Sequence, residues 1–201
     1  METKVVDFNS LELIHSIRNK EVACFPTETV YGLGVVFSSK EAFDSLVEVK
    51  ERRPDKPFTL MVSKKEDIEK YSYINSKTKK VIEEFMPGEI TILVKPKENL
   101  FPWVTLNSKY IGIRISGKKE VCQLIDKVGE PLLVTSANIS SYPASTNFDE
   151  AYRVFRGKVP YIVKGETSSS IPSTIVICDE ELMLVRQGNI PFEKIKKVWE
   201  S

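Results

Sequence analysis

The sequence predicts an α/β fold built on a twisted, mixed sheet of parallel and antiparallel strands, open at its edges and flanked by helices. Short apolar runs typical of buried strands alternate with stretches of helical periodicity along most of the chain. Two further apolar runs near the C-terminus are joined by a tight turn and predict a hairpin, which adds antiparallel pairs. Neither an internal repeat nor a linker divides the chain, so we expect a single domain over residues 1–201.

Composition narrows the class of protein. The chain has 201 residues, of which 41% are hydrophobic and 28% are charged, as in ordinary globular proteins. Its 29 Lys and Arg nearly balance its 28 Asp and Glu, which argues against a dedicated nucleic-acid binder. Three cysteines cannot pair completely and favour reduced thiols in the cytoplasm. No apolar run is long enough to predict a membrane span or a signal peptide.

Helices are predicted where apolar residues recur at helical spacing behind a capping residue. Residues 38–41 (Ser-Ser-Lys-Glu) read as a capping box ahead of one such stretch, and Asn147 is expected to cap another. A second capping box is expected at residues 63–66, and Gly129 is expected to end a helix. The predicted helices are residues 11–20, 38–50, 76–85, 118–128, 147–155 and 191–200.

Strands are predicted at the short apolar runs between these helices. The run at 111–115 is unusual because a charged residue, Arg114, lies within it. Residues 95–109, which contain two prolines, are expected to form a long connection. The predicted strands are residues 22–25, 33–37, 58–62, 90–94, 111–115, 132–134, 161–164, 174–178 and 182–187.

The segment at residues 24–34 is the most unusual stretch of the chain. Pro26 lacks an N–H group and is expected to end the first of its two strands. Two hydroxyls, a carboxylate, a phenol and two glycines follow within a few residues, and glycines let a ligand approach the backbone closely. Alone, this segment is equally consistent with an ordinary turn.

Later segments supply cations and hydroxyls of the kind that bind phosphate. Lys50, Arg52 and Lys56 lie in one loop braced by prolines. Hydroxyl and amide side chains follow a buried strand at Thr135, Ser136 and Asn138, and further polar residues occur at Ser168–Ser170, Ser173, Thr174 and Arg186. This set suits a polyphosphate and its metal ion, and phosphate chemistry needs charge stabilisation more than a nucleophile. No phosphate-loop motif, dinucleotide fingerprint, metal-ligand cluster or catalytic triad is present.

Each of these features also has a simpler explanation. The basic loop is also consistent with a solvated turn, the 135–138 segment with a helix cap, and the serine run with a flexible loop. Arg114 is also consistent with an edge-strand residue facing water.

The order of the motifs resembles the YrdC family of L-threonylcarbamoyladenylate synthases. Five motifs carry the resemblance over about residues 5–190: Pro26–Gly34, Lys50-x-Arg52 with Lys56-Pro57, Thr135–Asn138 with Ser140, Pro172–Val176, and Arg186-x-Gly188. The resemblance implies a YrdC-like fold with a deep positive cavity. It also implies a nucleotidyltransferase that condenses L-threonine, bicarbonate and ATP to threonylcarbamoyl-AMP and pyrophosphate, with Mg²⁺ accompanying the triphosphate. A separate transferase complex would then modify a tRNA adenosine beside the anticodon.

The resemblance also assigns roles to individual residues. Lys50 and Arg52 would be catalytic and, with Lys56, Ser136, Asn138, Ser145 and Arg186, would bind ATP. The threonine site would consist of Thr29, Tyr31, Arg114, Thr135 and Ser173, and no residue is assigned to a metal. Met61 stands where many members have a histidine, and Arg53 interrupts the usual Lys-x-Arg-Pro.

Two other functions compete with this one. The first is an RNA-binding module that uses the basic cavity, although the balanced charge predicts weak or no direct RNA binding. The second is a carbamoyl-adenylating relative similar to the corresponding domain of the hydrogenase maturation factor, which carries additional domains. A chain of this length is expected to correspond to the short, single-domain members of the family.

Overall fold

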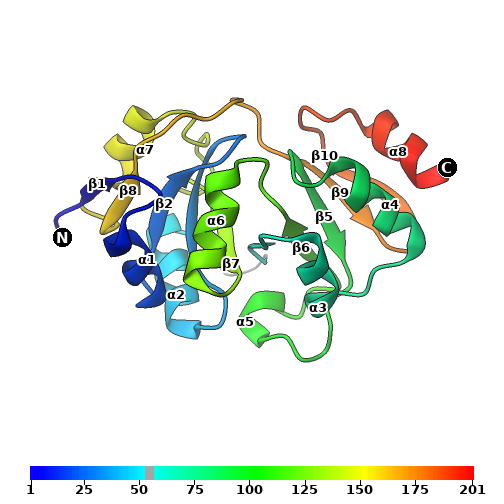
Figure 1. Cartoon of the computed structure of the whole chain (residues 1–201), viewed down its shortest axis with the longest axis horizontal. Coiled ribbons are helices and arrows are strands. Elements are labelled where there is room, and N and C mark those ends of the chain that lie inside the picture. Colours follow the sequence, from blue (N-terminus) through cyan, green and yellow to red (C-terminus); the bar gives the residue numbers. More distant parts are fainter. Residues whose placement is uncertain (53–56) are drawn as a thin grey trace.

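A ten-stranded mixed sheet organises the molecule (Figure 1). The computed structural model describes residues 1–52 and 57–201, so the predicted phosphate contact of Lys56 lies outside the described residues. The strand order is β1-β8-β2-β3-β7-β4-β6-β5-β9-β10, and both parallel and antiparallel pairs occur. This confirms the predicted fold class. The strands are β1 (Lys4–Val6), β2 (Ala23–Pro26), β3 (Tyr31–Val36), β4 (Thr59–Met61), β5 (Ile90–Val94), β6 (Ile111–Arg114), β7 (Leu132–Ser136), β8 (Tyr161–Val163), β9 (Thr174–Cys178) and β10 (Leu182–Arg186).

The helices pack against the sheet through their apolar sides. In the described chain, α1 contacts α6 and β3, α2 contacts β3, and α4 contacts the C-terminal α8 (Figure 1). Buried side chains such as Phe25, Leu33 and Leu46 join these elements in one hydrophobic core. The helices are α1 (Leu11–Arg18), α2 (Lys40–Lys50), α3 (Ile68–Tyr71), α4 (Ser76–Phe85), α5 (Pro102–Thr105), α6 (Lys119–Val128), α7 (Phe148–Phe155) and α8 (Phe192–Glu200), with a 3₁₀ turn at Lys65–Asp67.

The predicted caps have mixed outcomes. Asn147 accepts a bond from a backbone N–H group in the first turn of α7, as predicted, whereas α2 is capped by Ser39, one residue after the serine that the capping box at 38–41 would use. Gly129 ends α6 with a φ of 94°, a conformation that glycine adopts without strain. The capping box expected at residues 63–66 is wrong: Ser63 donates to Asp126, and the 3₁₀ turn that follows has no side-chain cap.

The segment at residues 24–34 is more regular than expected. β2 runs through Pro26, which pairs with Tyr31, so the first strand does not end before the proline. The following strand begins at Tyr31, and both glycines lie within it. A Cβ on Gly34 would lie 2.8 Å from the Phe25 ring, so this glycine serves close packing inside the sheet and not a turn.

The remaining differences concern short elements. The edge strand β1 and the one-turn helix α5 were not predicted, and α5 lies within the expected long connection at residues 95–109. β7 continues two residues beyond the predicted end, to Ser136. The three cysteines are free thiols. Within the described residues, no helix combines the length and the apolar character needed to cross a membrane.

Candidate functional site

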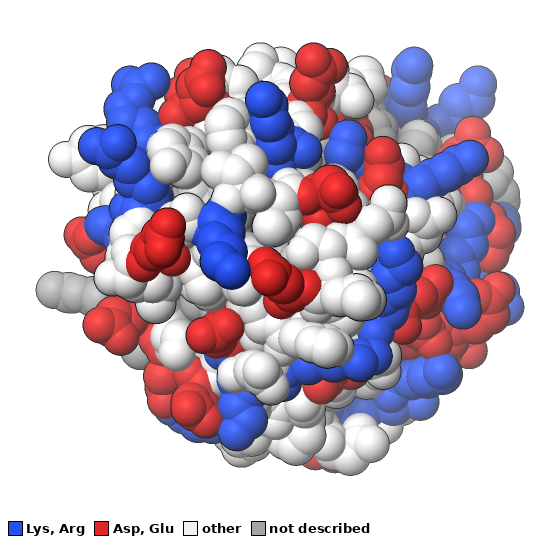
Figure 2. All heavy atoms as spheres, turned by 60° about the vertical axis from the view of Figure 1, so that its left-hand side comes forward, with Lys and Arg blue, Asp and Glu red and all other residues white. Residues whose placement is uncertain are grey.

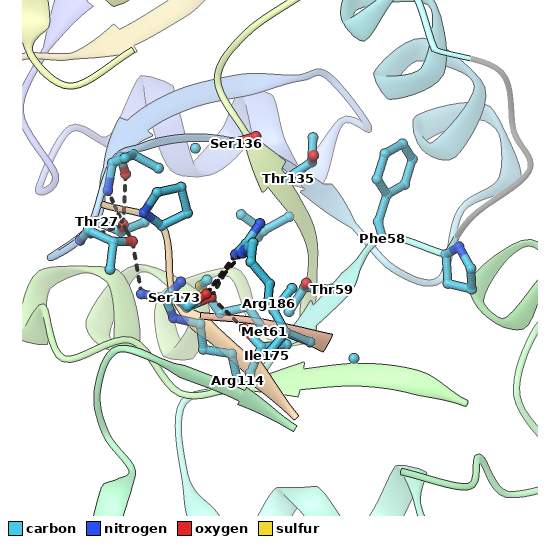
Figure 3. Close-up of a pocket in the computed structure, with 18 of the residues that line it drawn as sticks. Thr27, Phe58, Thr59, Met61, Arg114, Thr135, Ser136, Ser173, Ile175 and Arg186 are labelled. Carbon is cyan, nitrogen blue, oxygen red and sulfur yellow. Dashed lines mark hydrogen bonds between the residues drawn. The ribbon is translucent and has the colours of Figure 1, made fainter. Parts of the chain in front are cut away.

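A cavity of about 880 Å³ opens on the sheet, and half of the residues that line it lie in strands (Figure 3). Seven strands contribute: β3, β4, β5, β6, β7, β9 and β10. Among the described helices, only α2 supplies a wall residue, its final Lys50. The cavity therefore lies on a face of the sheet that the helices leave uncovered.

Strand alternation explains which side chains face the cavity. Met61 of β4 lies opposite Arg114 of the neighbouring β6, and both line the wall. Thr91 of β5 lies opposite Ile175 of β9, and these two also line it. Side chains on alternate positions share one face of a sheet, so Thr59, two residues before Met61, joins the same wall. Arg114 is thus a cavity residue in the middle of the sheet, and the edge-strand alternative is wrong.

Lys50 organises one end of the cavity. Its side chain is only 3% exposed. Its ammonium donates to the Ser136 carbonyl oxygen and to Asn138 Oδ1, both at 2.6 Å, and more weakly to Ser136 Oγ at 3.3 Å. These acceptors are uncharged, so the positive charge is not neutralised by them. Burial, helped by the nearby charge of Arg52, lowers the pKa of Lys50 to about 8.

The backbone of Lys50 holds the same loop from a second side. Its carbonyl oxygen accepts bonds from the Ser140 N–H at 3.0 Å and from Ser140 Oγ at 3.2 Å. The Asn138 amide in turn donates to the carbonyl oxygens of Ile139 and Tyr142. Because Lys50 ends helix α2, the helix fixes both the ammonium and the loop that follows β7.

Arg52 lines the same end, and its guanidinium carbon lies 5.2 Å from the centre of the Phe58 ring. Phe58 lies on the side of the cavity opposite Ser173 and Arg186 in Figure 3. The structure thus brings Lys50, Arg52, Ser136 and Asn138 together, as predicted, and the solvated-turn alternative does not hold for the buried Lys50.

Arg114 organises the other end of the cavity. Its side chain is 7% exposed, and its Nη2 donates to Glu28 Oε1 at 2.6 Å and to Thr29 Oγ1 at 3.0 Å. Its Nε is buried and has no hydrogen-bond partner in the described structure. An unpaired buried donor is costly, so the Nε group is a natural site for an acceptor atom of a ligand.

Glu28, which sequence reasoning assigned no role, is the counter-ion of Arg114. Its second carboxylate oxygen accepts a bond from the Ser116 hydroxyl. Burial alone would raise the pKa of Glu28, but the Arg114 charge and bonds from Ser116, Arg114 and the Gly117 backbone hold that pKa below its ordinary value. The carboxylate is therefore ionised at neutral pH. The clue in the sequence was a charged residue in mid-strand, which requires a buried partner somewhere in the chain.

Ser173 and Arg186 lie beside Arg114 (Figure 3). Arg186 donates through Nε and Nη2 to the Ser173 carbonyl oxygen, at 3.1 and 2.8 Å, and its Nη2 also reaches Ser173 Oγ at 3.2 Å. Ser173 Oγ also pairs with Thr91 Oγ1 at 2.9 Å. Burial and the charge of Arg114 lower the pKa of Arg186. Arg186 was predicted near the nucleotide, and the structure places it next to the predicted threonine residues.

Three predicted residues differ in how they meet the cavity. Thr135 points toward it from the end of β7 (Figure 3). Tyr31 also lines it, but its hydroxyl bonds the Gly165 carbonyl oxygen at 2.7 Å and so supports the fold. Ser145 is not one of the wall residues: its backbone accepts from Tyr31 and donates to Ala137. Wall residues outside the motifs and roles given by sequence reasoning are Phe58, Thr59, Thr91, Leu93, Ser108, Tyr110, Gly112, Val134 and Val185.

The fold and cavity define an α/β protein with a cavity rich in hydroxyls and cations. Among the described residues, no group of His, Cys, Asp and Glu could hold a metal ion. Residues 15–188 match the model of the Sua5, YciO and YrdC family, described as telomere recombination. The chain belongs to this family.

Relatives with assigned names agree with this family. The chain is 34% identical over 196 residues to a putative threonylcarbamoyl-AMP synthase of Methanocaldococcus jannaschii, with 96% of this chain and 90% of the relative covered. It is 31% identical to the threonylcarbamoyl-AMP synthase of Bacillus subtilis, covering 90% of this chain and 54% of that protein. The chain therefore spans nearly all of one relative and about half of the other.

Solved structures resemble the fold closely. The crystal structure of Pyrococcus abyssi Sua5 complexed with L-threonine matches 92% of this chain and 55% of that chain, with a TM-score of 0.88 and 29% identity. Escherichia coli YciO matches 96% of this chain and 98% of its own, with a TM-score of 0.84 and 21% identity. The second likeness shows the fold alone.

Proposed function

We infer that this chain is a threonylcarbamoyl-AMP synthase, which condenses L-threonine, bicarbonate and ATP to threonylcarbamoyl-AMP and pyrophosphate. The observation that carries this inference is the cavity with two separate cationic ends. Lys50 and Arg52 mark one end, and Arg114 with Arg186 marks the other. Such a cavity can hold a polyphosphate and a carboxylate at the same time, as a reaction between ATP and an amino acid requires.

We propose that the Lys50 end binds the triphosphate. Lys50 and Arg52 would offset the charge that develops when the threonine carbamate attacks the α-phosphorus and pyrophosphate leaves. Ser136 and Asn138 would position the phosphate oxygens, and the amide of Asn138 is already held by the loop. With this reaction the chain would be a nucleotidyltransferase.

We propose that the Arg114 end binds threonine. The unpaired Nε of Arg114 would donate to the substrate carboxylate, and the hydroxyls of Thr29, Thr135 and Ser173 would surround the rest of the amino acid. A planar guanidinium held on one side by Glu28 presents its remaining donors in a fixed direction.

Mg²⁺ would enter with the triphosphate. At the Lys50 end the described wall offers it hydroxyl oxygens from Ser136 and Ser140 and no carboxylate. Such neutral oxygens fit an ion whose main ligands are phosphate oxygens and water. The ion would supply further neutralisation of the phosphate charge.

The downstream step would be carried out by a separate tRNA threonylcarbamoyl transferase complex. Direct RNA binding is not favoured. Figure 2 shows Lys and Arg interspersed with Asp and Glu over the face that carries the N-terminal elements, without an extended basic surface.

The test of this function is incubation of the protein with ATP, bicarbonate and L-threonine, followed by mass spectrometry for threonylcarbamoyl-AMP and an assay for pyrophosphate. We expect the adduct only when all three substrates are present. Pyrophosphate release without dependence on threonine and bicarbonate would contradict the proposal.

A further inference from the structure

Lys50 and Arg114 differ in how their charges are compensated. At the Lys50 end, the acceptors of the ammonium are the Ser136 backbone and hydroxyl and the Asn138 amide, all neutral. At the other end, Arg114 forms a buried ion pair with Glu28, in which both side chains are about one tenth exposed. Low exposure keeps solvent and salt from screening either arrangement.

Among the described residues, the charged side chains at the Arg114 end are Arg114, Arg186 and Glu28. Arg114 and Arg186 are close enough for the charge of one to affect the titration of the other. The acceptors of Arg186 in the described structure are the carbonyl and hydroxyl oxygens of Ser173, which are neutral. Two guanidinium groups and one carboxylate leave a single net positive charge. That value matches the single carboxylate of an amino acid and is too small for a pyrophosphate or triphosphate chain.

Glu28 also controls the geometry of Arg114. Its Oε1 binds Nη2 at 2.6 Å, while its Oε2 is fixed by Ser116. The carboxylate does not line the main cavity; it lies behind Arg114 and borders a shallower groove with Gly117 and Lys118. Glu28 therefore acts on a substrate in the main cavity through the guanidinium of Arg114.

We propose that Glu28 is a positioning and specificity-determining residue. Glu28 orients Arg114 and lowers the net positive charge of the Arg114 end, so that this end of the cavity accepts a monocarboxylate and rejects polyphosphate. The consequence is that ATP has one productive orientation. Its phosphates are directed to Lys50, and the amino-acid end stays open for threonine. This inference rests on the proposed function for the identity of the two ligands.

The test uses calorimetric titration of L-threonine with and without inorganic pyrophosphate, together with the KM values for threonine and ATP. The variants are Glu28→Gln, Glu28→Asp and, as a matched control, Glu120→Gln. Glu120 is exposed and borders the same shallow groove, so its substitution removes one negative charge nearby without contacting Arg114.

For Glu28→Gln we expect the KM for threonine to rise about tenfold or more, because Arg114 loses its charged anchor, while the KM for ATP stays within about twofold. Pyrophosphate should weaken threonine binding in this variant and leave it unchanged in the unmodified protein and in Glu120→Gln. Glu28→Asp keeps the charge but shortens the reach, so threonine affinity should fall while pyrophosphate still does not compete.

Several outcomes would overturn the inference. Unchanged threonine affinity and no pyrophosphate competition in Glu28→Gln would do so, as would equal losses of ATP and threonine binding, which indicate a general structural role. If Glu28→Gln does not fold, Glu28→Asp decides: normal threonine affinity there contradicts the positioning role. Absence of threonine binding by the unmodified protein would instead refute the proposed function.

Discussion

The Lys50 end and the Arg114 end of the cavity hold their cations in different ways. Lys50 lies at the end of a helix and is satisfied by a loop, whereas Arg114 lies within the sheet and is satisfied by a carboxylate. The neutral acceptors of Lys50 leave the lysine charge uncompensated, and burial lowers its pKa to about 8. The carboxylate keeps the arginine in place and compensates its positive charge. Buried cations in one cavity can therefore be adapted to different anions by the neutral or charged groups to which they bond.

The largest effect is expected from removing the Lys50 charge. Lys50→Met keeps an unbranched side chain of similar length and loses the ammonium, so we expect ATP-dependent pyrophosphate release to fall by more than about 100-fold, since charge-assisted bonds contribute about 1.5–3 kcal/mol each. Threonine binding, measured by calorimetry, should hold. Activity within a few-fold of normal would remove Lys50 from the phosphate site.

Selectivity among threonine, valine and serine tests whether the hydroxyl groups at the Arg114 end bind the substrate's hydroxyl. Valine has the shape of threonine without its hydroxyl, so its use would leave buried polar groups such as Thr135 unpaired. We expect kcat/KM for valine to be about 100-fold lower than for threonine. Serine keeps the hydroxyl and loses one methyl group, worth about 1 kcal/mol, so it should lie between the two. Equal use of valine and threonine would refute this description of the pocket.

The pH dependence should distinguish the two ends. Because the pKa of Lys50 is about 8, its ammonium is largely charged at pH 7 and mostly neutral at pH 9. ATP affinity should therefore fall up to about tenfold over this interval, with a midpoint near pH 8. The midpoint can be followed by ATP titration at each pH, and a flat profile would contradict the lowered pKa.

Deprotonation of Lys50 should affect the free energy of unfolding in the direction opposite to its effect on ATP affinity. A pKa lowered from 10.5 to about 8 means that the unfolded state binds more protons than the folded state between these values. The contribution of Lys50 to the free energy of unfolding therefore increases as the pH rises through this window. ATP affinity and this contribution should change in opposite directions, and Lys50→Met should abolish both changes.

A smaller effect is expected from Ser116→Ala. This change removes one bond to Glu28 and leaves the ion pair with Arg114 intact. The KM for threonine should rise by about threefold, consistent with the loss of roughly one hydrogen bond, and the KM for ATP should not change. A larger rise than in Glu28→Gln would mean that Ser116, and not Glu28, is the main support of Arg114.

The sequence predicted much of the fold and the cations of the cavity. Hydrophobic runs and caps are local signals, so helices such as α4 and strands such as β5 were placed correctly. The strand order could not be predicted, because pairs such as β5 with β9 join segments far apart in the chain. Short β1 and α5 carry too few residues for a periodic signal.

The partners of the site residues were the main omission. Lys50 and Arg114 were singled out from their positions in the sequence, but Glu28 lies 86 positions from Arg114 and pairs with it only after folding. Ser136 and Asn138, which bond Lys50 across comparable separations, were placed beside it only through the family resemblance. Roles read from single residues thus missed the difference in compensation between the two ends.

The most direct test of the two-ended cavity measures ATP and threonine binding separately in two variants, Arg52→Ala and Arg114→Lys. Arg52→Ala should weaken ATP binding about tenfold or more and leave threonine binding unchanged. Arg114→Lys keeps the charge but loses the planar fork, so it should weaken threonine binding and leave ATP binding unchanged. If either variant loses affinity for both ligands, or if Arg114→Lys loses ATP alone, the assignment of two anions to two separate ends is wrong.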